Sequence, residues 1–409
     1  MRNKINSELV KLNNKYKQMK ILIINSGSSS IKYQLIEMPS TTVLCRGMVE
    51  RIGLENSKLN YKTEQHKIEE VVEIKNHKVG LEKIAQVLMN DEIGVIKSTL
   101  EIDAVGHRVV HGGSTFSKTV VIDQKVKDKI REFFFLAPLH NPPNYEGIEV
   151  AEEIFSTAKQ IAVFDTAFHQ TIPTVAYKYA IPNKFLDEDK IRVYGFHGTS
   201  HKYVSEKAIE YLEGKSSKLI TIHLGNGCSM TAVKDGKSVD HSLGFGPMNG
   251  LMMGTRSGDI DQSVIFYMVN NLGYTMDQVN NLLQKESGMI GLTGFSDLRD
   301  IEERADNGDV NCQLALDMNA YRIKKYIGSF TAIMNGLDAI IFTAGVGENS
   351  YTLRSLICKD LDYLGISIDA EKNHVKARKL TEIHDENSKV KVLIIPTNEE
   401  AEIAKQSYE

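Results

Sequence analysis

Residues 20–36 read KILIINSGSSSIKYQLI, and this stretch decides the fold. Its first part, residues 20–24, is short, apolar and β-branched, which is typical of a buried strand, and it stops at a polar loop of Asn, Ser and Gly. Residues 31–36 then alternate apolar and polar side chains, which predicts a second strand paired with the first as a hairpin. A dinucleotide-binding loop would lead into a helix instead, so this stretch does not predict a Rossmann arrangement.

The same design recurs near the middle of the chain. Residues 219–224, LITIHL, predict a strand that enters the loop GNGCS at 225–229, and residues 230–233 predict the returning strand. Asp235 and Gly236 follow as a turn. Two such units predict two related domains.

A third glycine-rich loop is predicted at residues 345–350, between a strand at 339–343 and a helix-compatible stretch. Free N–H groups and the dipole at the start of that helix would favour a phosphate. A Gly-rich turn is by default only a turn, but three of them after apolar strands point together to phosphate binding. The chain contains neither GxxxxGK[ST] nor GxGxxG, so a nucleotide would be held without these loops.

Two helices are clear in the pattern of apolar residues. One is predicted to begin at a cap formed by Thr199 or Ser200 and to end at Gly214. The other covers residues 313–334 and is closed by an Asn-Gly pair. Strands that alternate with helices place the chain in the α/β class.

Length and composition limit the kind of protein. At 409 residues the chain exceeds the roughly 250–300 residues at which one core stops growing, so two domains are expected. A formal net charge of -4 gives no field for gripping nucleic acid, and no apolar run approaches the roughly 18 residues of a membrane helix. No nucleic-acid or membrane partner is therefore expected. The cysteines lack a CxxC pair and fit reduced thiols of a cytoplasmic protein: Cys45, Cys228, Cys312 and Cys358.

Residues 1–18 are polar and rich in Lys and Asn, and they precede a second methionine, Met19, that opens the first strand. They are interpreted as an N-terminal extension, which is either disordered, a frayed helix or the result of a mis-called start. No secretory signal pattern is present in this stretch.

Arg and His lie beside glycines in three segments: GHRVVHGG at 106–113, GFHGTSH at 195–201 and GTRSGD at 254–259. A lone Arg or His is most often a solvated or structurally paired side chain. Joining an anionic acceptor to ATP, however, requires several fixed positive groups, because the repulsion between the two anions must be cancelled. These segments supply such groups.

Acidic candidates are fewer. Asp165 lies in VFDTAFH at 163–169, and Glu399 lies in IPTNEE at 395–400. Magnesium keeps several waters and needs only one or two protein oxygens, so one carboxylate together with Asn25 would suffice. Taken alone, Glu399 also fits an acid in the first turn of a helix, where it complements the dipole.

From Met19 to the end, motif after motif resembles the acetate kinase family, which belongs to a superfamily with sugar kinases, actin and heat-shock ATPase domains. The resembling stretches are INSGSSSIKYQL, GHRVVHGG, APLHNP, FDTAFHQTIP, YGFHGTSHKYV, HLGNGCS, GLMMGTRSGDID, FTAGVGENS and IPTNEE. They occur in family order and with family-like spacing.

The resemblance implies a two-domain actin-like (ribonuclease H-like) α/β fold, with a duplicated ββαβαβ core and an interdomain cleft. Domain I would comprise residues 19–166, and residues 399–409 would return to it. Domain II would comprise residues 167–398, bind the nucleotide and form a homodimer.

The implied activity is reversible transfer of the γ-phosphoryl group of ATP to acetate, which gives acetyl phosphate and ADP by direct in-line transfer. Magnesium, for which manganese can substitute, is the implied cofactor, and ATP is the co-substrate. A propionate or other short-chain acyl kinase is the nearest alternative. A non-catalytic ATP-binding or chaperone-like module of the same superfamily is the alternative from another class.

The family's functional residues match positions of this chain. The implied catalytic residues are Asp165, His197, Arg256 and Arg108, and the implied magnesium-organising pair is Asn25 and Glu399. Acetate would contact Arg108, Val110, Leu139, His140, Phe196 and Pro247. ATP would contact Ser28, Ser30, Lys32, His223, Leu224, Gly225, Asn226, Gly227, Asp297, Leu298, Arg299, Gly345, Val346, Gly347, Glu348 and Asn349.

Asp165 matches the residue usually described as a proton donor or acceptor. Acetate, like a side-chain carboxyl with a pKa near ~4, is already ionised at neutral pH and needs no general base. We therefore expect Asp165 to position magnesium-bound water or an active-site cation.

The chain departs from the family pattern at a few positions. Ser26 stands where Ala is usual, Pro143 where Ala is common and Gln262 where Pro is usual. Family members also carry Thr before Pro247 and Leu-Glu after it, whereas this chain has Gly246 and Met-Asn. A looser wall for the acyl chain is predicted, and one added methylene changes binding by only about 1–3 kcal/mol, so propionate should be a poorer but real substrate.

Overall fold

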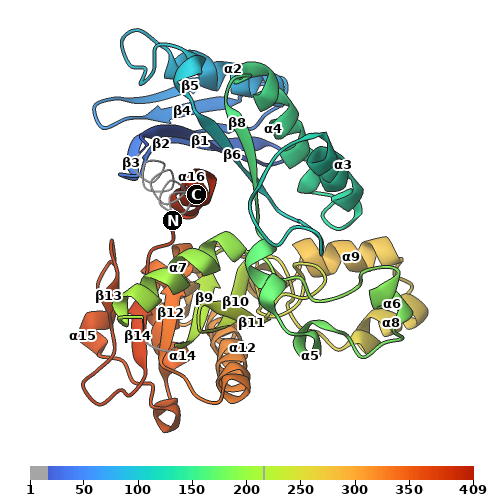
Figure 1. Ribbon diagram of the computed structural model, residues 1–409. Helices are drawn as coiled ribbons and strands as arrows, with labels where there is room; N and C mark the ends of the chain where they lie inside the picture. The colour runs from blue at the N-terminus through green and yellow to red at the C-terminus, as the bar shows by residue number, and fades with distance from the viewer. Residues whose placement is uncertain (1–16, 215–216) are drawn as a thin grey trace, which may run out of the picture. The chain divides into compact units, whose positions relative to one another are not determined.

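The computed structural model describes residues 17–214 and 217–409 (Figure 1). The chain forms two compact units, called unit 1 and unit 2 below. Unit 1 comprises Met1–Ala167 and Asn398–Glu409, and unit 2 comprises Phe168–Thr397. Residues 1–16, which make up most of the predicted N-terminal extension, lie outside the described residues.

Unit 1 contains one sheet of eight strands in the order β5-β4-β3-β2-β1-β6-β8-β7. The strands are β1 (Met19–Ser26), β2 (Ser30–Met38), β3 (Thr42–Glu50), β4 (Lys58–Lys62), β5 (Lys67–Val71), β6 (Ala104–Val109), β7 (Val120–Val121) and β8 (Lys159–Phe164). The predicted hairpin is confirmed, since β1 and β2 are antiparallel, and β1, β6 and β8 are parallel to one another.

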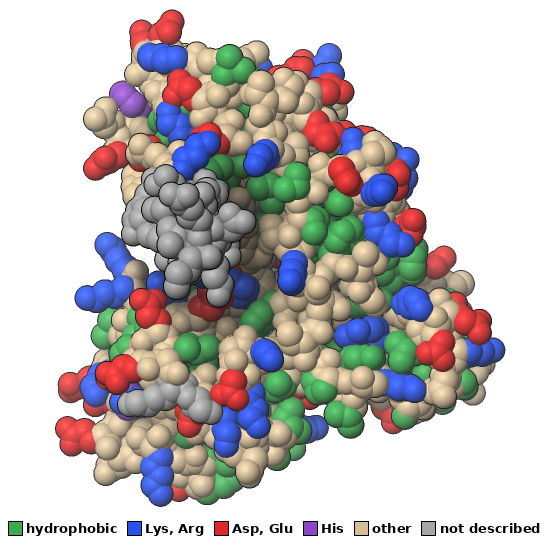
Figure 2. Space-filling view, in the orientation of Figure 1, with side chains coloured by type: hydrophobic (Ala, Val, Ile, Leu, Met, Phe, Trp, Pro, Cys, Tyr) green, Lys and Arg blue, Asp and Glu red, His purple; other side chains and the backbone are tan. Residues whose placement is uncertain are grey.

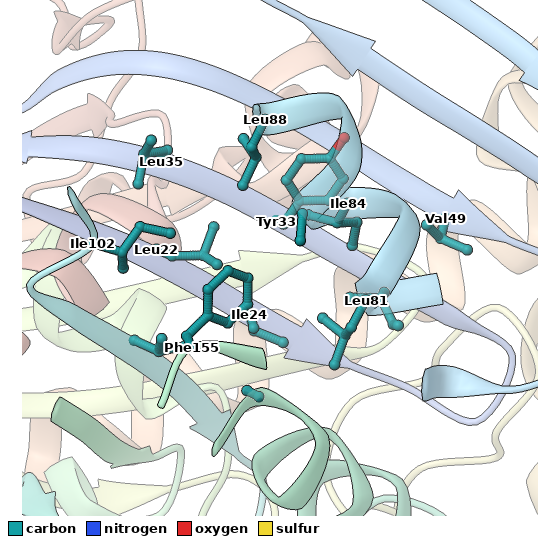
Figure 3. Close-up of a cluster of buried hydrophobic side chains, with 14 of the residues drawn as sticks. Leu22, Ile24, Tyr33, Leu35, Val49, Leu81, Ile84, Leu88, Ile102 and Phe155 are labelled. Atoms are coloured by element: carbon teal, nitrogen blue, oxygen red, sulfur yellow. The ribbon is translucent and has the colours of Figure 1, made fainter. Parts of the chain in front are cut away.

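Helices cover both faces of this sheet. They are α2 (His77–Leu88), η1 (Thr99–Glu101), α3 (Gln124–Glu132), η2 (Phe133–Phe135), α4 (Asn141–Ile154) and α16 (Glu399–Tyr408). Leu22 and Ile24 point to the face covered by α2, where Leu81 and Ile84 join them in one buried cluster (Figure 3). Ile21 and Ile23 point to the other face, against α16. A strand buried on both faces reads as a continuous apolar run, which explains the composition of β1.

Unit 2 contains a sheet of six strands in the order β11-β10-β9-β12-β14-β13. The strands are β9 (Lys218–Leu224), β10 (Cys228–Lys234), β11 (Lys237–His241), β12 (Ala339–Thr343), β13 (Thr381–Glu382) and β14 (Lys391–Ile394). β9 and β10 are antiparallel, as predicted, and β9, β12 and β14 are parallel. The order β11-β10-β9-β12-β14 repeats β3-β2-β1-β6-β8 with the same strand directions, so the α/β core is duplicated.

The remaining helices, in chain order, are η3 (Ala167–Thr171), α5 (Thr174–Tyr177), α6 (Lys184–Asp187), α7 (Gly198–Tyr211), α8 (Gln262–Asn271), α9 (Met276–Lys285), α10 (Gly288–Thr293), α11 (Leu298–Asp306), α12 (Val310–Met334), α13 (Ala344–Asn349), α14 (Tyr351–Cys358), η4 (Asp362–Leu364) and α15 (Ala370–Asn373). The predicted helix over 313–334 is confirmed as part of α12, which ends at Asn335 in the left-handed conformation. In the described parts of the chain, no helix is long and apolar enough to cross a membrane.

Two local predictions are wrong. The residue that caps α7 is His197, not Thr199 or Ser200, because the Ser200 hydroxyl bonds instead to His223 and Thr397. The glycine-rich segment after β12 is not a loop but the short helix α13. Side chains stabilise this helix despite its glycines, since Asn349 donates to Gly345 O at 2.8 Å.

Charged side chains of both signs lie interspersed over the face shown in Figure 2. This distribution agrees with the small formal net charge of -4. The four cysteines are free and buried, as the sequence predicts.

Candidate active site

The carboxyl ends of β1, β6 and β8 lie at one edge of the sheet of unit 1, because these strands are parallel. Open α/β sheets bind ligands outside this edge. Asn25 is the second-last residue of β1, Arg108 lies near the end of β6, and Asp165 directly follows β8. Asn25 also lies opposite Lys32 in the β1–β2 hairpin. The topology therefore gathers the predicted metal, phosphate and acetate residues of this unit.

Arg108 and Asp165 form a close ion pair. Arg108 Nε lies 3.1 Å from Asp165 Oδ1 and 3.0 Å from Oδ2, and Nη2 lies 2.5 Å from Oδ2. The Asp165 side chain is only 2 % exposed and that of Arg108 is 19 % exposed. Burial acts to lower the pKa of Arg108, but the carboxylates of Asp165 and Glu399 outweigh it and hold the pKa above its ordinary value. Arg108 is thus a fixed cation.

Glu399 begins α16 and completes this group. Its Oε2 lies 3.9 Å from Arg108 Nε, and its side chain is 23 % exposed. Burial raises the pKa of Glu399, while the positive charges of Arg108 and Lys32 oppose the rise. The positive charges of Arg108 and Lys32 therefore do not fully offset the effect of burial on the Glu399 carboxylate.

The oxygens of Asn25 and Glu399 fit a magnesium ion by their chemistry, because this ion prefers hard oxygen ligands and keeps much of its water. A divalent cation would also offset the negative charge of the partly buried Glu399 carboxylate. Within residues 17–214 and 217–409, no cluster of three or more His, Cys, Asp or Glu side chains could hold a metal ion by itself.

Two asparagines of α4 fix the loops at the ends of β1 and β6. Neither asparagine was predicted from the sequence. Asn144 accepts from Val110 N at 3.0 Å and donates to Ser26 O at 2.6 Å, which ties the end of β1 to the end of β6. Asn141 exchanges two hydrogen bonds of 3.0 Å with the backbone of His111. The available signal was the motif APLHNP, which contains Asn141 but ends before Asn144.

The hairpin of β1 and β2 is also held from outside. His77, at the start of α2, lies 2.7 Å from Gly27 O through Nε2 and 3.3 Å from the Glu146 carboxylate through Nδ1. Gly27 N donates to Ser30 O at 2.8 Å, and Ser28 and Lys32 are exposed. The side chains predicted to face a phosphate are therefore accessible in this unit.

The predicted acetate contacts of unit 1 differ in exposure. Val110 is half-buried, whereas Leu139 is 63 % exposed and His140 is exposed at the start of α4. Leu139 and His140 therefore do not form an enclosed wall within this unit.

In unit 2 the structure brings His197 and His223 together. Their rings are stacked with centroids 4.4 Å apart. His197 Nδ1 lies 2.8 Å from Ser229 Oγ, and His223 Nδ1 lies 2.9 Å from Ser200 Oγ. A Cβ added to Gly227 would lie 3.7 Å from the His197 ring, so the GNGCS loop passes close to this imidazole.

A cavity of about 300 Å³ lies beside the GNGCS loop. Six predicted nucleotide contacts line it or adjoin it: Leu224, Gly225, Asn226, Asp297, Leu298 and Val346. The predicted contacts that are absent from its lining are His223, Gly227, Arg299, Gly345, Gly347, Glu348 and Asn349. The cavity also has an apolar wall that was not predicted from the sequence, and this wall includes Met252, Met253, Met289 and Leu353. Such a cavity suits a flat, partly apolar group.

Arg299 lies away from this cavity wall. It forms an ion pair with Asp297, whose Oδ2 is 2.5 Å from Nη2, and its side chain is 88 % exposed. The hydrogen bond from Arg299 lowers the pKa of Asp297 to about 2. An exposed ion pair of this kind contributes little to stability.

Arg256 lies against the segment that carries Pro247. Its Nη1 donates to Pro247 O at 3.1 Å, and burial lowers the pKa of Arg256. No Cβ at Gly246 would meet an atom within 4 Å, so the wall beside Pro247 is open at that point. The structure thus joins two predicted site residues, Arg256 and Pro247, through one hydrogen bond.

A buried arginine stabilises α13. Arg354, 1 % exposed, donates to Gly347 O at 2.9 Å and to Asn373 Oδ1 at 2.8 Å. Burial lowers the pKa of Arg354 to about 10. Glu348 accepts from Thr397 N at 3.0 Å, which links α13 to the end of the unit.

Comparisons with known proteins find similarity over almost the whole chain. A family model described as the acetokinase family matches residues 20–405. The acetate kinase of Flavobacterium johnsoniae is 67 % identical over 391 residues, which are 96 % of this chain and 99 % of that protein. The crystal structure of Porphyromonas gingivalis acetate kinase has a TM-score of 0.91 at 45 % identity and covers 95 % of this chain and 98 % of its own. A propionate kinase from Francisella tularensis has a TM-score of 0.89 at 43 % identity, covering 95 % and 99 %.

Proposed function

The chain belongs to the acetokinase family, and from this premise we propose that it is an acetate kinase that transfers the γ-phosphoryl group of ATP to acetate. The observation that carries this proposal is the fixed Arg108 cation, held by Asp165 at the carboxyl edge of the unit 1 sheet. Acetate is an anion, and a rigid guanidinium binds a carboxylate in bidentate fashion without changing its own charge.

In the proposed reaction, the predicted residues of each unit have separate roles. In unit 1, Arg108 orients acetate and Asp165 holds Arg108. Asn25 and Glu399 would hold magnesium, which would supply positive charge beside the phosphates of ATP. In unit 2, His197 and Arg256 stabilise the equatorial oxygens of the transferred phosphoryl group. Acetate reacts as the carboxylate, so the reaction needs no general base.

The cavity of unit 2 supports the assignment of ATP to that unit. Its wall combines Met side chains with the Asn226 amide and the Asp297 carboxylate, which suits an adenine ring and its polar edge. The stacked imidazoles of His197 and His223 adjoin the same GNGCS loop, where they would meet the phosphates.

We also propose that the chain works in the cytoplasm as a homodimer through unit 2. Large apolar side chains are exposed on α8 and α12: Val264, Phe266, Tyr267, Leu314, Met318, Tyr321 and Ile333. Phe266 is 63 % exposed and Tyr321 is 67 % exposed, which is unusual for a face that only meets water. Size-exclusion chromatography with light scattering tests the dimer, and Phe266→Glu should weaken it.

A propionate kinase is the second candidate, because the structure of the Francisella tularensis propionate kinase is nearly as similar as the acetate kinase structure. The open wall at Gly246 also leaves room for one more carbon. Trapping of the acyl phosphate with hydroxylamine, in the presence of ATP and magnesium, tests the proposed reaction. Hydroxamate that forms with acetate supports it, whereas ATP hydrolysis that does not depend on acetate contradicts it.

A further inference from the structure

Two buried imidazoles of unit 2 hold the peptide groups of Phe196. His169 Nε2 lies 3.0 Å from Phe196 O, and His241 Nε2 lies 3.1 Å from Phe196 N. His169 is 0 % exposed and His241 is 5 % exposed, and their ring centroids are 4.2 Å apart. Phe196, which immediately precedes His197, is therefore hydrogen-bonded at both its backbone N–H and its backbone carbonyl.

These contacts fix opposite tautomers of the two rings. Phe196 O can only accept, so His169 Nε2 carries the hydrogen, and His169 Nδ1 then accepts from Ser238 Oγ at 2.9 Å. Phe196 N donates, so His241 Nε2 is unprotonated, and His241 Nδ1–H donates to Thr231 Oγ1 at 2.8 Å. Burial holds the pKa of His241 well below its ordinary value, which keeps the neutral ring that an acceptor nitrogen requires.

The gripped peptides lie between two residues in the left-handed conformation. Gly195 has φ of +75° and His197 has φ of +55°. A Cβ on Gly195 would lie 2.8 Å from His169 Cδ2 and 3.0 Å from His241 Cδ2, so the backbone passes directly against both rings. A non-glycine residue in the left-handed region is strained and persists only where its surroundings hold it.

We propose that His169 and His241 are positioning residues that hold the Phe196 peptides and thereby keep His197 in the conformation that aims its ring. The inference rests on the role proposed above for His197 in phosphoryl transfer. Phe196 is 5 % exposed, so its backbone cannot exchange these partners for water without opening the unit. The two histidines act through His197 and do not themselves touch the reacting atoms.

Paired Gln and Asn substitutions separate positioning from simple core packing. A Gln side chain reaches the place of a histidine Nε2, whereas an Asn side chain reaches only that of Nδ1. His241→Gln therefore keeps an acceptor for Phe196 N, and His241→Asn keeps only the bond to Thr231.

We expect kcat of His241→Asn to fall roughly 10- to 100-fold, since small misplacements of a catalytic group have effects of this size. His241→Gln should keep most of kcat. KM for ATP should stay within about twofold in both variants, because the ATP cavity is lined by other residues. The same order, Gln above Asn, is expected at His169.

Four further variants complete the test. His384→Asn and His384→Gln are the matched controls, because His384 is a buried histidine of the same unit that contacts Lys391 rather than Phe196. These two control variants should change Tm but should have the same kcat as each other. Thr231→Val keeps the His241 ring but removes the acceptor of its Nδ1–H, so a lower kcat for Thr231→Val than for Thr231→Ser supports the inference even if the variants at 241 do not fold.

The outcomes are distinguishable. If His197→Ala is inactive while His241→Asn and His241→Gln have equal kcat, or kcat simply follows Tm, the positioning inference is overturned and the role of His197 stands. Equal kcat for Thr231→Val and Thr231→Ser overturns it as well. A fully active His197→Ala removes the role on which the inference rests and overturns both.

Discussion

The guanidinium of Arg108 and the carboxylate of Asp165 form a multiply hydrogen-bonded ion pair, with Nε 3.0 Å and Nη2 2.5 Å from the same oxygen, Oδ2. Both carboxylate oxygens of Asp165 already accept from Arg108, so the geometry favours a carboxylate that orients a cation over one that removes a proton. The pair joins the ends of two adjacent parallel strands, β6 and β8. Acetate would then meet a guanidinium that is already oriented.

The first prediction concerns Asp165→Asn, which keeps the shape of the side chain and removes its charge. Arg108 would lose its main partner, so kcat should fall by roughly 10²-fold or more and KM for acetate should rise. Steady-state kinetics at several magnesium concentrations provide the measurement. Near-normal turnover with unchanged magnesium dependence would show that Asp165 does not position a cation.

Glu101→Gln is the matched control for this variant. Glu101 pairs with Lys20 at 2.5 Å in the same unit, but its side chain is 36 % exposed and lies outside the proposed site. An exposed ion pair contributes only about 0–1 kcal/mol, so the control should keep its activity.

The second prediction concerns Ser26, whose buried hydroxyl has no hydrogen-bond partner among the described residues. Ser26→Ala removes an unsatisfied polar group and should raise the free energy of unfolding by about 1 kcal/mol. Ser57→Ala is the opposite case, because the buried Ser57 hydroxyl donates to Arg51 O or Leu54 O, at 2.9 and 2.7 Å. Denaturant unfolding of both variants should give changes of opposite sign, and a destabilised Ser26→Ala would refute this account of the hydroxyl.

The fold was more predictable from the sequence than the site. Strands such as β1, β9 and β12 were predictable because runs buried on both faces are mostly apolar and a glycine follows each strand shortly after its end. The start of α7 was not, because the Ser200 hydroxyl is used by partners far along the chain, His223 and Thr397. Pairs such as Arg108 and Asp165 are 57 residues apart, and no local spacing reveals that they meet.

The resemblance identified candidate site residues but not what holds them. Asn144, which links Ser26 O to Val110 N, carries no signal of its own in a helix rich in polar residues. The Phe196 peptides are likewise held by histidines that lie 27 and 45 residues away in the sequence. Supporting contacts of this kind become visible only when the chain is folded.

The third prediction concerns acid stability. Burial lowers the pKa of His107 in β6 to about 4, so between pH 6.5 and 4 the unfolded chain binds a proton that the folded protein does not. His107 should therefore reduce stability as the pH falls through this window, by up to about 3 kcal/mol. His107→Gln should flatten the loss of unfolding free energy between pH 7 and 4, although its stability at pH 7 is lower because the bond to Gln160 changes.

The control for His107 is the exposed His66. His66→Gln should leave the slope of stability against pH as it is in the unsubstituted protein. Equal slopes for both variants would mean that His107 is protonated in the folded protein at the same pH as in the unfolded chain.

The fourth prediction concerns the GNGCS loop at residues 225–229. A Cβ at Gly254 would lie 2.1 Å from Asn226 Oδ1, so Gly254→Ala should displace the Asn226 side chain, which lines the cavity of unit 2. The clash meets the end of a side chain, so Tm should change little while KM for ATP rises roughly tenfold, the effect of about 1.4 kcal/mol of lost binding. Gly328→Ala, whose new Cβ meets nothing within 4 Å, should leave KM unchanged. An unaltered KM for ATP in Gly254→Ala would separate this cavity from the nucleotide.

The most direct test of the central claim is a coupled ATP assay that compares kcat/KM for acetate, propionate and butyrate. A hydrophobic wall discriminates one methylene by about 10- to 200-fold, and the open position at Gly246 places the ratio of acetate to propionate toward the lower end. We predict the order acetate, propionate, butyrate, with ADP formation strictly dependent on the acid. Equal ADP formation with and without acetate, or a higher kcat/KM for propionate than for acetate, would contradict the proposed function.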